Sequence, residues 1–322
     1  MKICLVTGSS GFIGSNLVEN LLRQGNMVVA LSKNIKKEDS IENIKYKQKG
    51  RYISISRDIL DRDFVMELFP KYKFHEVYHL AGQSSPTLSW EKPAETMKIN
   101  YSGTLNILDG ALKENISTAI VLVSSSAVYS PHNQNSPIKE NSECRPVSPY
   151  GISKLAMDQL GTLYAKAYGL RVTSARPFFI IGPGKINDVC SDWIRNIVLL
   201  ERDELKSLSI GTINGIARDF LAVSDAVSAL IKIVSNGEPG QAYNICSGEA
   251  IYLSSILEFL KKNAKNNFKI EVDEKKFRPI EEFIKVGDNR KLISLGWSKK
   301  ENIETCMHNI LKYWRSRYIS NT

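Results

Sequence analysis

A tyrosine and a lysine in the stretch SPYGISK, residues 148–154, have the types and the spacing of an acid–base pair. Tyr150 and Lys154 are four residues apart, so a helix would place them on one face. Ser148 suits an N-cap and Pro149 the first helical position, so a helix is expected to begin here. A free phenol, with a pKa of about 10, is a weak acid near neutrality, and a neighbouring ammonium favours its phenolate. The pair predicts proton transfer, although this spacing also occurs by chance on many helices.

Three glycines in the stretch TGSSGFIG follow the apolar run KICLV near the start of the chain. A strand that turns sharply into a helix needs residues free to adopt positive φ, and a pyrophosphate at that helix N-terminus needs backbone without Cβ atoms. The spacing GxxGxxG in this context predicts a dinucleotide-binding turn, and the alternative is a glycine-rich turn without a ligand. The residues expected beside the cofactor are Gly8, Ser10, Gly11, Phe12, Ile13 and Gly14.

The second expected strand ends without the acidic residue that commonly binds the ribose 2′-hydroxyl of NAD. Its end reads LSKNIKK, in which Ser32 and Lys33 offer a hydroxyl and a cation. These groups suit a 2′-phosphate, so the sequence predicts NADPH or NADP as the cofactor and favours it over NAD. The alternative is that Lys33 is an ordinary solvated surface lysine.

The serine run SSSAVY at 124–129 follows a further expected strand at 118–123. Sites in parallel sheets collect at the carboxyl ends of the strands, so these hydroxyls are expected to face the cofactor crevice. Ser125 would hydrogen-bond a substrate carbonyl while Tyr150 protonates it and a hydride arrives from the nicotinamide. Ser125, Tyr150 and Lys154 are therefore the candidate catalytic residues.

Short apolar runs alternate with amphipathic segments of helical length through the first half of the chain. The expected strands are 2–6, 27–31, 52–55, 76–80, 118–123 and 171–175, and the helices between them include 12–25 and 94–115. This alternation predicts an α/β fold of the Rossmann type, with a doubly wound parallel sheet covered on both faces. A dinucleotide-binding domain is expected over 1–176, with some later segments interleaved, and a smaller α/β substrate lobe over 177–322.

The composition is that of a folded water-soluble protein, with 43% hydrophobic and 24% charged residues. The apolar runs are shorter than the roughly 20 residues of a membrane span and no secretory signal is evident, so no membrane partner and a cytoplasmic location are expected. Five scattered cysteines and four histidines without ligand spacing predict neither disulfides nor a metal. The net charge of +9 is dispersed and suits an anionic small substrate, so no nucleic-acid partner is predicted.

The stretches TGSSGFIG, HLAGQSS, SSSAVY and YGISK together resemble the extended short-chain dehydrogenase/reductase family that acts on nucleotide sugars. The likeness covers nearly the whole chain. It implies a nucleotide-diphosphate sugar in the C-terminal lobe, the catalytic trio named above, and a homodimer through the helices holding 93–114 and 149–168. The further cofactor contacts that the resemblance implies are Asp58 and Ile59 near the adenine and Leu80, Ala81 and Gly82 near the ribose.

Other stretches, SWEKPAET, NYSGTLNILDGA, RPFFIIGPG, DWIRNI and FRPIEEF, are similar to the reductases that act on GDP-4-keto-6-deoxy-D-mannose. That similarity implies arginine ligands for the diphosphate and base, although each arginine is equally suited to a surface ion pair. Phe179 stands where the family has an asparagine, so the sugar is expected to sit differently or to be a different one. The expected substrate residues are Gln83, Ser85, Ser126, Phe179, Arg195, Arg218 and Arg278.

Dehydratases of the family resemble one another in an Asp-Glu pair directly after the catalytic hydroxyl residue, where this chain has Ser126 and Ala127. Elimination of water would lack its acid and base here. The leading hypothesis is NADPH-dependent reduction of a nucleotide-linked 4-keto-6-deoxy sugar, with GDP as the nucleotide, and the alternative is an NAD-dependent 4-epimerase. A binding module without catalysis is disfavoured because all three catalytic residues are present.

Overall fold

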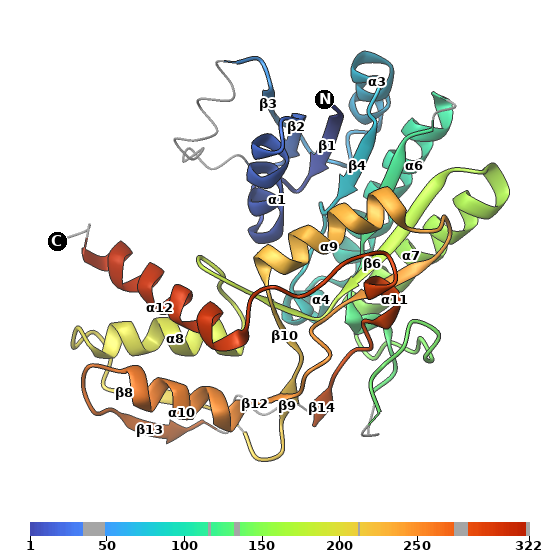
Figure 1. Cartoon of the computed structure of the whole chain (residues 1–322). Coiled ribbons are helices and arrows are strands. Elements are labelled where there is room, and N and C mark those ends of the chain that lie inside the picture. The colour runs from blue at the N-terminus through green and yellow to red at the C-terminus, as the bar shows by residue number, and fades with distance from the viewer. Residues whose placement is uncertain (35–48, 115–116, 132–135, 212, 274–282, 320–322) are drawn as a thin grey trace.

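The structure is a computed structural model that describes residues 1–34, 49–114, 117–131, 136–211, 213–273 and 283–319. In these residues a seven-stranded parallel sheet has the order β11-β6-β5-β4-β1-β2-β3 (Figure 1). The strand order reverses at β1, so a crevice is expected beyond its carboxyl end. The strands are β1 (Ile3–Thr7), β2 (Met27–Ser32), β3 (Tyr52–Ser56), β4 (Glu76–His79), β5 (Ala119–Val123), β6 (Arg171–Pro177) and β11 (Ala242–Ile245).

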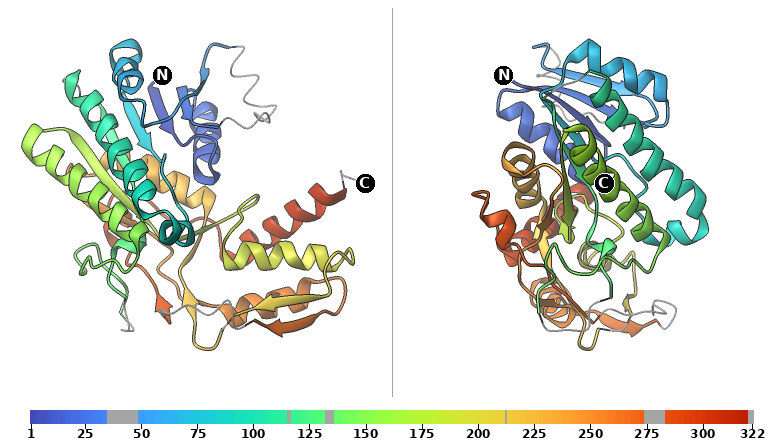
Figure 2. Two further views of the ribbon diagram at one scale, coloured as in Figure 1. Left: turned by 180° about the vertical axis from the view of Figure 1, so that it is seen from behind. Right: turned by 90° about the vertical axis from the view of Figure 1, so that its right-hand side faces the viewer.

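Two layers of helices cover the sheet, which confirms the predicted doubly wound architecture. Successive strand residues point to opposite faces, so Cys4 and Val6 join one apolar core while Leu5 joins the other. The right-hand view of Figure 2 shows the sheet between these two layers. The helices are α1 (Phe12–Arg23) and α9 (Val223–Asn236) on one face, and α3 (Arg62–Tyr72), α6 (Gly103–Lys113) and α7 (Pro149–Tyr168) on the other.

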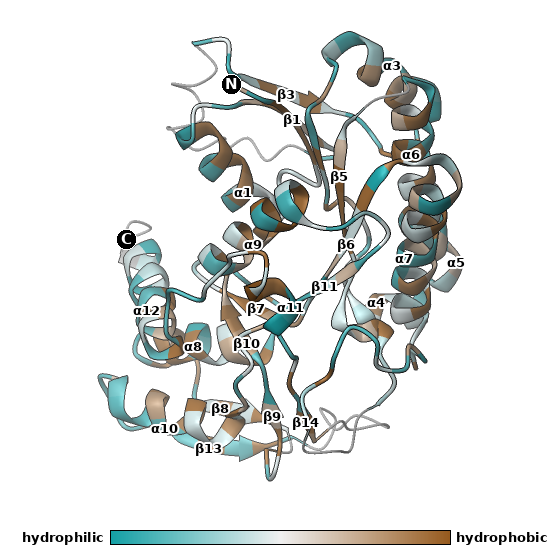
Figure 3. Cartoon of the chain, turned by 45° about the vertical axis from the view of Figure 1, so that its right-hand side comes forward, coloured by the Kyte–Doolittle hydropathy of each residue, from teal (hydrophilic) through white to brown (hydrophobic). Residues whose placement is uncertain are grey.

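The apolar periods of the sequence account for these elements. In α1, Leu17, Leu21 and their neighbours form one buried stripe at helical spacing. All five residues of β5, AIVLV, are buried, as expected for a central strand covered on both faces. Figure 3 shows the result, with hydrophobic strands at the centre and hydrophilic surfaces on the outer helices.

A smaller lobe lies beyond the carboxyl edge of the sheet and has its own apolar core around Ile194, Ile256 and Ile310. The chain returns from it to the large sheet through α9 and β11, next to the short α11 (Arg290–Ile293). The elements of the lobe are β7 (Phe179–Ile181), α8 (Val189–Leu200), β8 (Ser207–Ile210), β9 (Ala217–Arg218), β10 (Phe220–Ala222), β12 (Ile251–Tyr252), α10 (Leu253–Asn263), β13 (Lys269–Val272), β14 (Ile284–Lys285) and α12 (Ile303–Ile319).

Short elements line the carboxyl edge of the large sheet. They are α4 (Pro86–Glu91), α5 (Pro93–Met97), the π-helical turn η1 (Lys98–Ser102) and the 3-10 turn η2 (Ser126–Val128). The helix expected over 94–115 is thus interrupted by η1, and π turns of this kind are frequent at functional sites.

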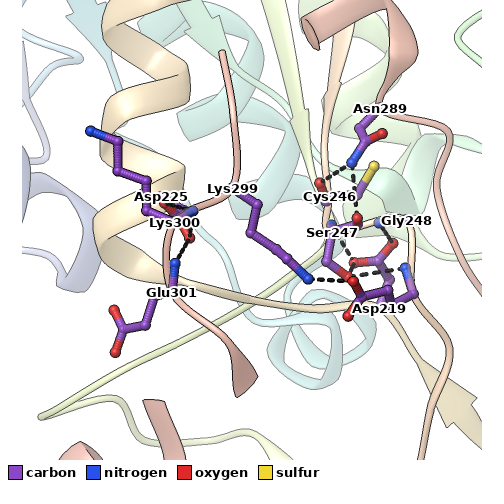
Figure 4. A network of polar contacts seen from close by, with 10 residues as sticks. Asp219, Asp225, Cys246, Ser247, Gly248, Asn289, Lys299, Lys300 and Glu301 are labelled. Carbon is purple, nitrogen blue, oxygen red and sulfur yellow. Dashed lines mark hydrogen bonds and ion pairs between the residues drawn. The ribbon is translucent and has the colours of Figure 1, made fainter. Parts of the chain in front are cut away.

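Buried carboxylates connect the smaller lobe to the rest of the protein (Figure 4). Asp219, between β9 and β10, accepts hydrogen bonds from the Ser247 amide (2.6 Å), the Ser247 hydroxyl (2.7 Å) and the Gly248 amide (3.0 Å), which follow β11. It also accepts one from the Gly287 amide at 3.1 Å. Burial raises the pKa of Asp219 to about 6 against these hydrogen bonds. Asp225 of α9 accepts from the Lys300 and Glu301 amides ahead of α12, at 3.0 and 2.9 Å.

Three further observations concern the thiols, metal ligands and helix lengths of the described residues. The five cysteine side chains are free thiols, four of them buried. No group of three or more His, Cys, Asp or Glu side chains among the described residues is arranged to hold a metal ion. None of the helices described here has the length and apolar character needed to cross a membrane.

Candidate active site

A cavity of about 1290 Å³ lies where the carboxyl ends of the large sheet meet the smaller lobe. It collects residues from the loops that directly follow β1 and β4, from β2, from η2 and α7, and from the lobe strands β7 and β14. Every residue that the sequence patterns and the resemblance propose for the cofactor lines it. These residues are Gly8, Ser10, Gly11, Phe12, Ile13, Gly14, Ser32, Lys33, Asp58, Ile59, Leu80, Ala81, Gly82, Tyr150 and Lys154.

The glycine turn fits a pyrophosphate because side chains cannot occupy it. Gly8 has a φ of +67°, and a Cβ atom there would lie 2.7 Å from the Ala81 amide nitrogen. A Cβ atom at Gly14 would lie 2.2 Å from the Gly8 carbonyl oxygen, so α1 packs directly on the turn. Gly11 is the N-cap of α1 and has no side chain to cover the helix amides. The amide end of α1 is therefore open to an anion from the cavity.

Tyr150 and Ser125 meet because α7 begins against η2. As predicted, the Ser148 hydroxyl caps α7 by accepting from the Gly151 amide at 3.1 Å, with Pro149 in the first turn. A Cβ atom at Gly151 would lie only 2.4 Å from the Ala127 carbonyl oxygen, so a glycine allows this close approach. Burial raises the pKa of Tyr150, while a hydrogen bond with Ser125 opposes that rise.

Lys154 is buried one helical turn after Tyr150. Its Nζ donates to the Val123 carbonyl at 2.9 Å, at the end of β5. Burial lowers the pKa of Lys154 to about 8, with Asp158 opposing the change. The sequence predicts that the lysine lowers the pKa of the phenol, whereas in the structure burial dominates and that pKa is raised. The phenol therefore stays protonated near neutrality and suits a proton donor.

Asn100 of η1 supports the site from outside the cavity lining, and none of the sequence patterns indicates it. Its Nδ2 donates to the Gln83 carbonyl at 3.0 Å and to the Ser153 hydroxyl at 2.8 Å, and its Oδ1 accepts from the Gln83 amide at 2.8 Å. Ser153 donates in turn to the Tyr150 carbonyl at 2.7 Å. Asn100 thus fixes the loop after β4 against α7. The one signal in the sequence that could have indicated Asn100 is its polar side chain within a helical stretch of mainly apolar period.

His79 supports the same edge from inside the core. Its Nδ1 is 2.8 Å from the Thr7 hydroxyl and its Nε2 is 3.1 Å from the Thr104 hydroxyl. Thr7 also accepts from the Ala81 amide at 3.1 Å. Burial, with a contribution from the Lys154 charge, lowers the pKa of His79 to about 3, so the imidazole is neutral. His79 therefore fixes the ends of β1 and β4 without adding charge.

The expected substrate residues divide into those that line the cavity and those that do not. Gln83, Ser126 and Phe179 line it. Ser85 instead caps α4, where its hydroxyl accepts from the Leu88 amide at 3.2 Å.

Two of the three proposed arginines, Arg195 and Arg218, are described and do not line the cavity. Arg195 on α8 packs over the Trp314 ring, and its Nε is 3.3 Å from the Tyr318 hydroxyl, so it contacts α12. Arg218 is buried behind Phe179, with its guanidinium carbon 5.5 Å from the centre of that ring. Arg278 lies outside the described residues.

Lys285 is a cation in the cavity wall that the sequence did not indicate. It lies on β14 beside Arg218 in the parallel register, and 5% of its surface is exposed. Lys285 and Phe179 line the same cavity. A positive charge thus stands at the end of the cavity formed by the smaller lobe, where the resemblance implies the substrate.

Comparison with known proteins agrees with this geometry. The family described as GDP-mannose 4,6 dehydratase matches residues 5–310. GDP-6-deoxy-D-mannose reductase from Pseudomonas aeruginosa is 34% identical over 264 residues, covering 81% of this chain and 86% of the relative. CDP-paratose 2-epimerase from Salmonella typhi is 28% identical over 283 residues, covering 81% and 83%.

A solved structure of RMD from Pseudomonas aeruginosa complexed with NADPH superposes with a TM-score of 0.84 at 30% identity. The match covers 98% of this chain and 100% of that one. The likeness therefore extends over both lobes and the cavity between them. This chain belongs to the GDP-mannose 4,6 dehydratase family, within the extended short-chain dehydrogenases/reductases that act on nucleotide sugars.

Proposed function

We propose that the protein is an NADPH-dependent reductase of a nucleotide-linked 4-keto-6-deoxy sugar, with GDP as the nucleotide. The observation that carries the proposal is the meeting of Ser125, Tyr150 and Lys154 in one cavity with an open glycine turn. The relative of 34% identity is a GDP-6-deoxy-D-mannose reductase, which supports the reaction, and the similar solved structure of RMD is complexed with NADPH, which supports the cofactor.

The residues of the site account for the proton of such a reduction. NADPH, when bound on the glycine turn, supplies the hydride that the carbonyl carbon accepts. Ser125 holds the carbonyl oxygen by a hydrogen bond, and Tyr150 gives that oxygen its hydroxyl proton, so the ketone becomes an alcohol. The buried ammonium of Lys154 stabilises the phenolate that remains.

Dehydration is not proposed, although the family takes its description from a dehydratase. Ser126 and Ala127 follow Ser125 directly and offer no carboxyl group to remove or deliver the protons of an elimination. Phe179 and the smaller lobe would receive the nucleotide-diphosphate part, where Lys285 supplies a positive charge.

The decisive experiment follows NADPH absorbance with GDP-4-keto-6-deoxy-mannose as substrate. One NADPH is expected to be consumed for each sugar reduced, and Tyr150→Phe is expected to lower kcat/KM by on the order of 10² to 10⁴. Tyr252→Phe, at a side chain exposed in the smaller lobe, is the matched control and should be unchanged. Full turnover by Tyr150→Phe would contradict the proposal. Inversion of the C4 hydroxyl of a GDP-sugar alcohol without added cofactor would indicate the 4-epimerase instead.

The nucleotide is tested separately by calorimetry with GDP, UDP, CDP and dTDP. GDP is expected to bind at least about tenfold more tightly than the others if its base is read. Lys285→Met should weaken all four diphosphates alike, because the ammonium would contact phosphate rather than base. Equal binding of the four by the unaltered protein would remove GDP from the proposal while leaving the reductase chemistry intact.

We also propose a homodimer through the face formed by α6 and α7. Ile152, Leu163 and Tyr168 of α7 are exposed by 48%, 55% and 56%, which is unusual for large apolar side chains on one helix. Leu163→Glu is expected to halve the mass in light scattering, whereas Tyr252→Glu on the other lobe should leave it unchanged. A monomeric unaltered protein would contradict the dimer.

A further inference from the structure

We propose that Arg57, at the end of β3, recognises the 2′-phosphate of NADPH; this rests on the proposed function in taking NADPH as the cofactor. Arg57 lines the cavity together with Ser32, Lys33 and Asn34. Its amide donates to the Ser32 carbonyl at 3.1 Å, so the ends of β2 and β3 lie side by side here. No acidic residue ends β2, and a phosphate at this place would meet the residues that follow both strands.

Lys33, the cation that the sequence favours for this role, already has a carboxylate partner. Its Nζ is 2.9 Å from Asp58 Oδ2, and Asp58 Oδ1 accepts from the Leu60 amide at 3.0 Å. The hydrogen bond with Asp58 raises the pKa of Lys33. Burial opposes the ionisation of Asp58, but the hydrogen bonds from Leu60 and Lys33 outweigh it, and its pKa is lowered. A phosphate approaching Lys33 would therefore meet the negative charge of Asp58.

Ser32 is also engaged, but in a way that leaves room for an anion. Its hydroxyl is 2.8 Å from the Ser10 hydroxyl and accepts from the Ser10 amide at 3.1 Å. This contact joins the end of β2 to the glycine turn. A short neutral side chain stands where a carboxylate would repel a phosphate.

Arg57 has a longer ion-pair distance to its carboxylate than Lys33 has, and its guanidinium lies near an aromatic ring. Its Nη1 is 3.9 Å from Asp61 Oδ2, beyond hydrogen-bond distance, and the other oxygen of that carboxylate caps α3 by accepting from the Phe64 amide at 3.3 Å. The guanidinium carbon lies 5.6 Å from the centre of the Phe64 ring, which supports it from one side. The planar fork of a guanidinium matches two phosphate oxygens, so binding would replace water rather than a tight ion pair.

The test measures binding of 2′,5′-ADP and of 5′-AMP, which differ by the 2′-phosphate, by calorimetry at fixed salt. The unaltered protein is expected to prefer 2′,5′-ADP. Arg57→Ala should weaken 2′,5′-ADP by on the order of 10- to 100-fold and leave 5′-AMP within about twofold. Arg57→Lys should keep part of the preference, and Lys33→Ala should lose less than Arg57→Ala. Arg62→Ala, an exposed guanidinium of α3 paired with Asp109, is the matched control and should change neither ligand.

Three results would overturn the inference. Equal weakening of both ligands by Arg57→Ala would show a packing role, and a larger loss in Lys33→Ala would assign the phosphate to that lysine. If the unaltered protein bound 2′,5′-ADP and 5′-AMP equally well, the proposal of NADPH as the cofactor would fail. That outcome is distinct from a failure of Arg57 alone, in which the unaltered protein still prefers 2′,5′-ADP. Circular dichroism checks that each variant is folded, and Arg57→Lys, which preserves the charge, carries the comparison if the alanine variant is not.

Discussion

At the scale of single residues, burial sets the protonation state of the site. The phenol of Tyr150 has a raised pKa and the ammonium of Lys154 a pKa lowered to about 8, both chiefly because the charged forms lose water. His79, beside them, is neutral for the same reason. Near neutral pH the site therefore holds a protonated phenol and a charged lysine, the pair that a carbonyl reduction needs.

The lowered pKa of Lys154 predicts how activity depends on pH. The ammonium is present below about pH 8 and is lost as the pH rises through that value, and with it the charge that stabilises the phenolate left by proton donation. We expect kcat/KM for the keto-sugar to fall above about pH 8, measured with NADPH saturating. Lys154→Arg should move the fall to higher pH, because a guanidinium keeps its proton. A profile that stays level to pH 10 would contradict this assignment.

At the scale of secondary-structure elements, the site depends on two helices that approach neighbouring backbone closely. The amide end of α1 packs on the glycine turn, and the first turn of α7 packs on η2. The π turn η1 adds Asn100, which joins the loop after β4 to α7. The proposed catalytic groups are thus held by contacts between elements rather than by any one element.

Gly151 tests this dependence. Alanine in place of glycine ordinarily stabilises a helix by up to about 1 kcal/mol, but its Cβ here would lie 2.4 Å from the Ala127 carbonyl oxygen. We expect Gly151→Ala to push α7 from η2 and to lower kcat at least about tenfold, since displacements of this kind misalign reacting groups. Ser255→Ala, at an exposed position of α10 away from the proposed dimer face, is the control for assays of kcat and of NADPH affinity. Unchanged kcat in Gly151→Ala would show that the two elements need not touch.

At the scale of the whole molecule, the cavity exists because the two lobes meet at the carboxyl edge of the sheet. Gly8 and Lys154 come from the large sheet and its helices, whereas Phe179 and Lys285 come from the smaller lobe. Asp219 fixes their junction by accepting from Ser247 and Gly248 (Figure 4). It also accepts from the Gly287 amide. Substrate and cofactor would therefore be brought together by the way the lobes are joined.

Asp219→Ala is expected to lower the free energy of unfolding by about 2–4 kcal/mol, because it leaves buried amides without an acceptor. Urea denaturation followed by circular dichroism measures the change. Glu258→Ala, at an exposed carboxylate of α10, is the control and should stay within about 0.5 kcal/mol. A loss in Asp219→Ala no larger than in the control would mean that the junction holds without this carboxylate.

The sequence by itself determined the elements and the local parts of the site. The spacing of apolar residues predicted six strands between residues 2 and 175. Short patterns proposed Gly8, Ser125 and Tyr150 for the site, because strand, turn and helix-cap preferences act between residues close in the chain.

Only the tertiary structure decided which distant side chains share the cavity. Arg195 contacts α12, whereas Lys285 and Arg57 line the cavity, and no local pattern distinguishes these cations. The tertiary structure also decided whether the pKa of the Tyr150 phenol is raised or lowered. Burial and long-range contacts arise only when remote segments pack, so the balance between desolvation and charge cannot be read from residues near in sequence.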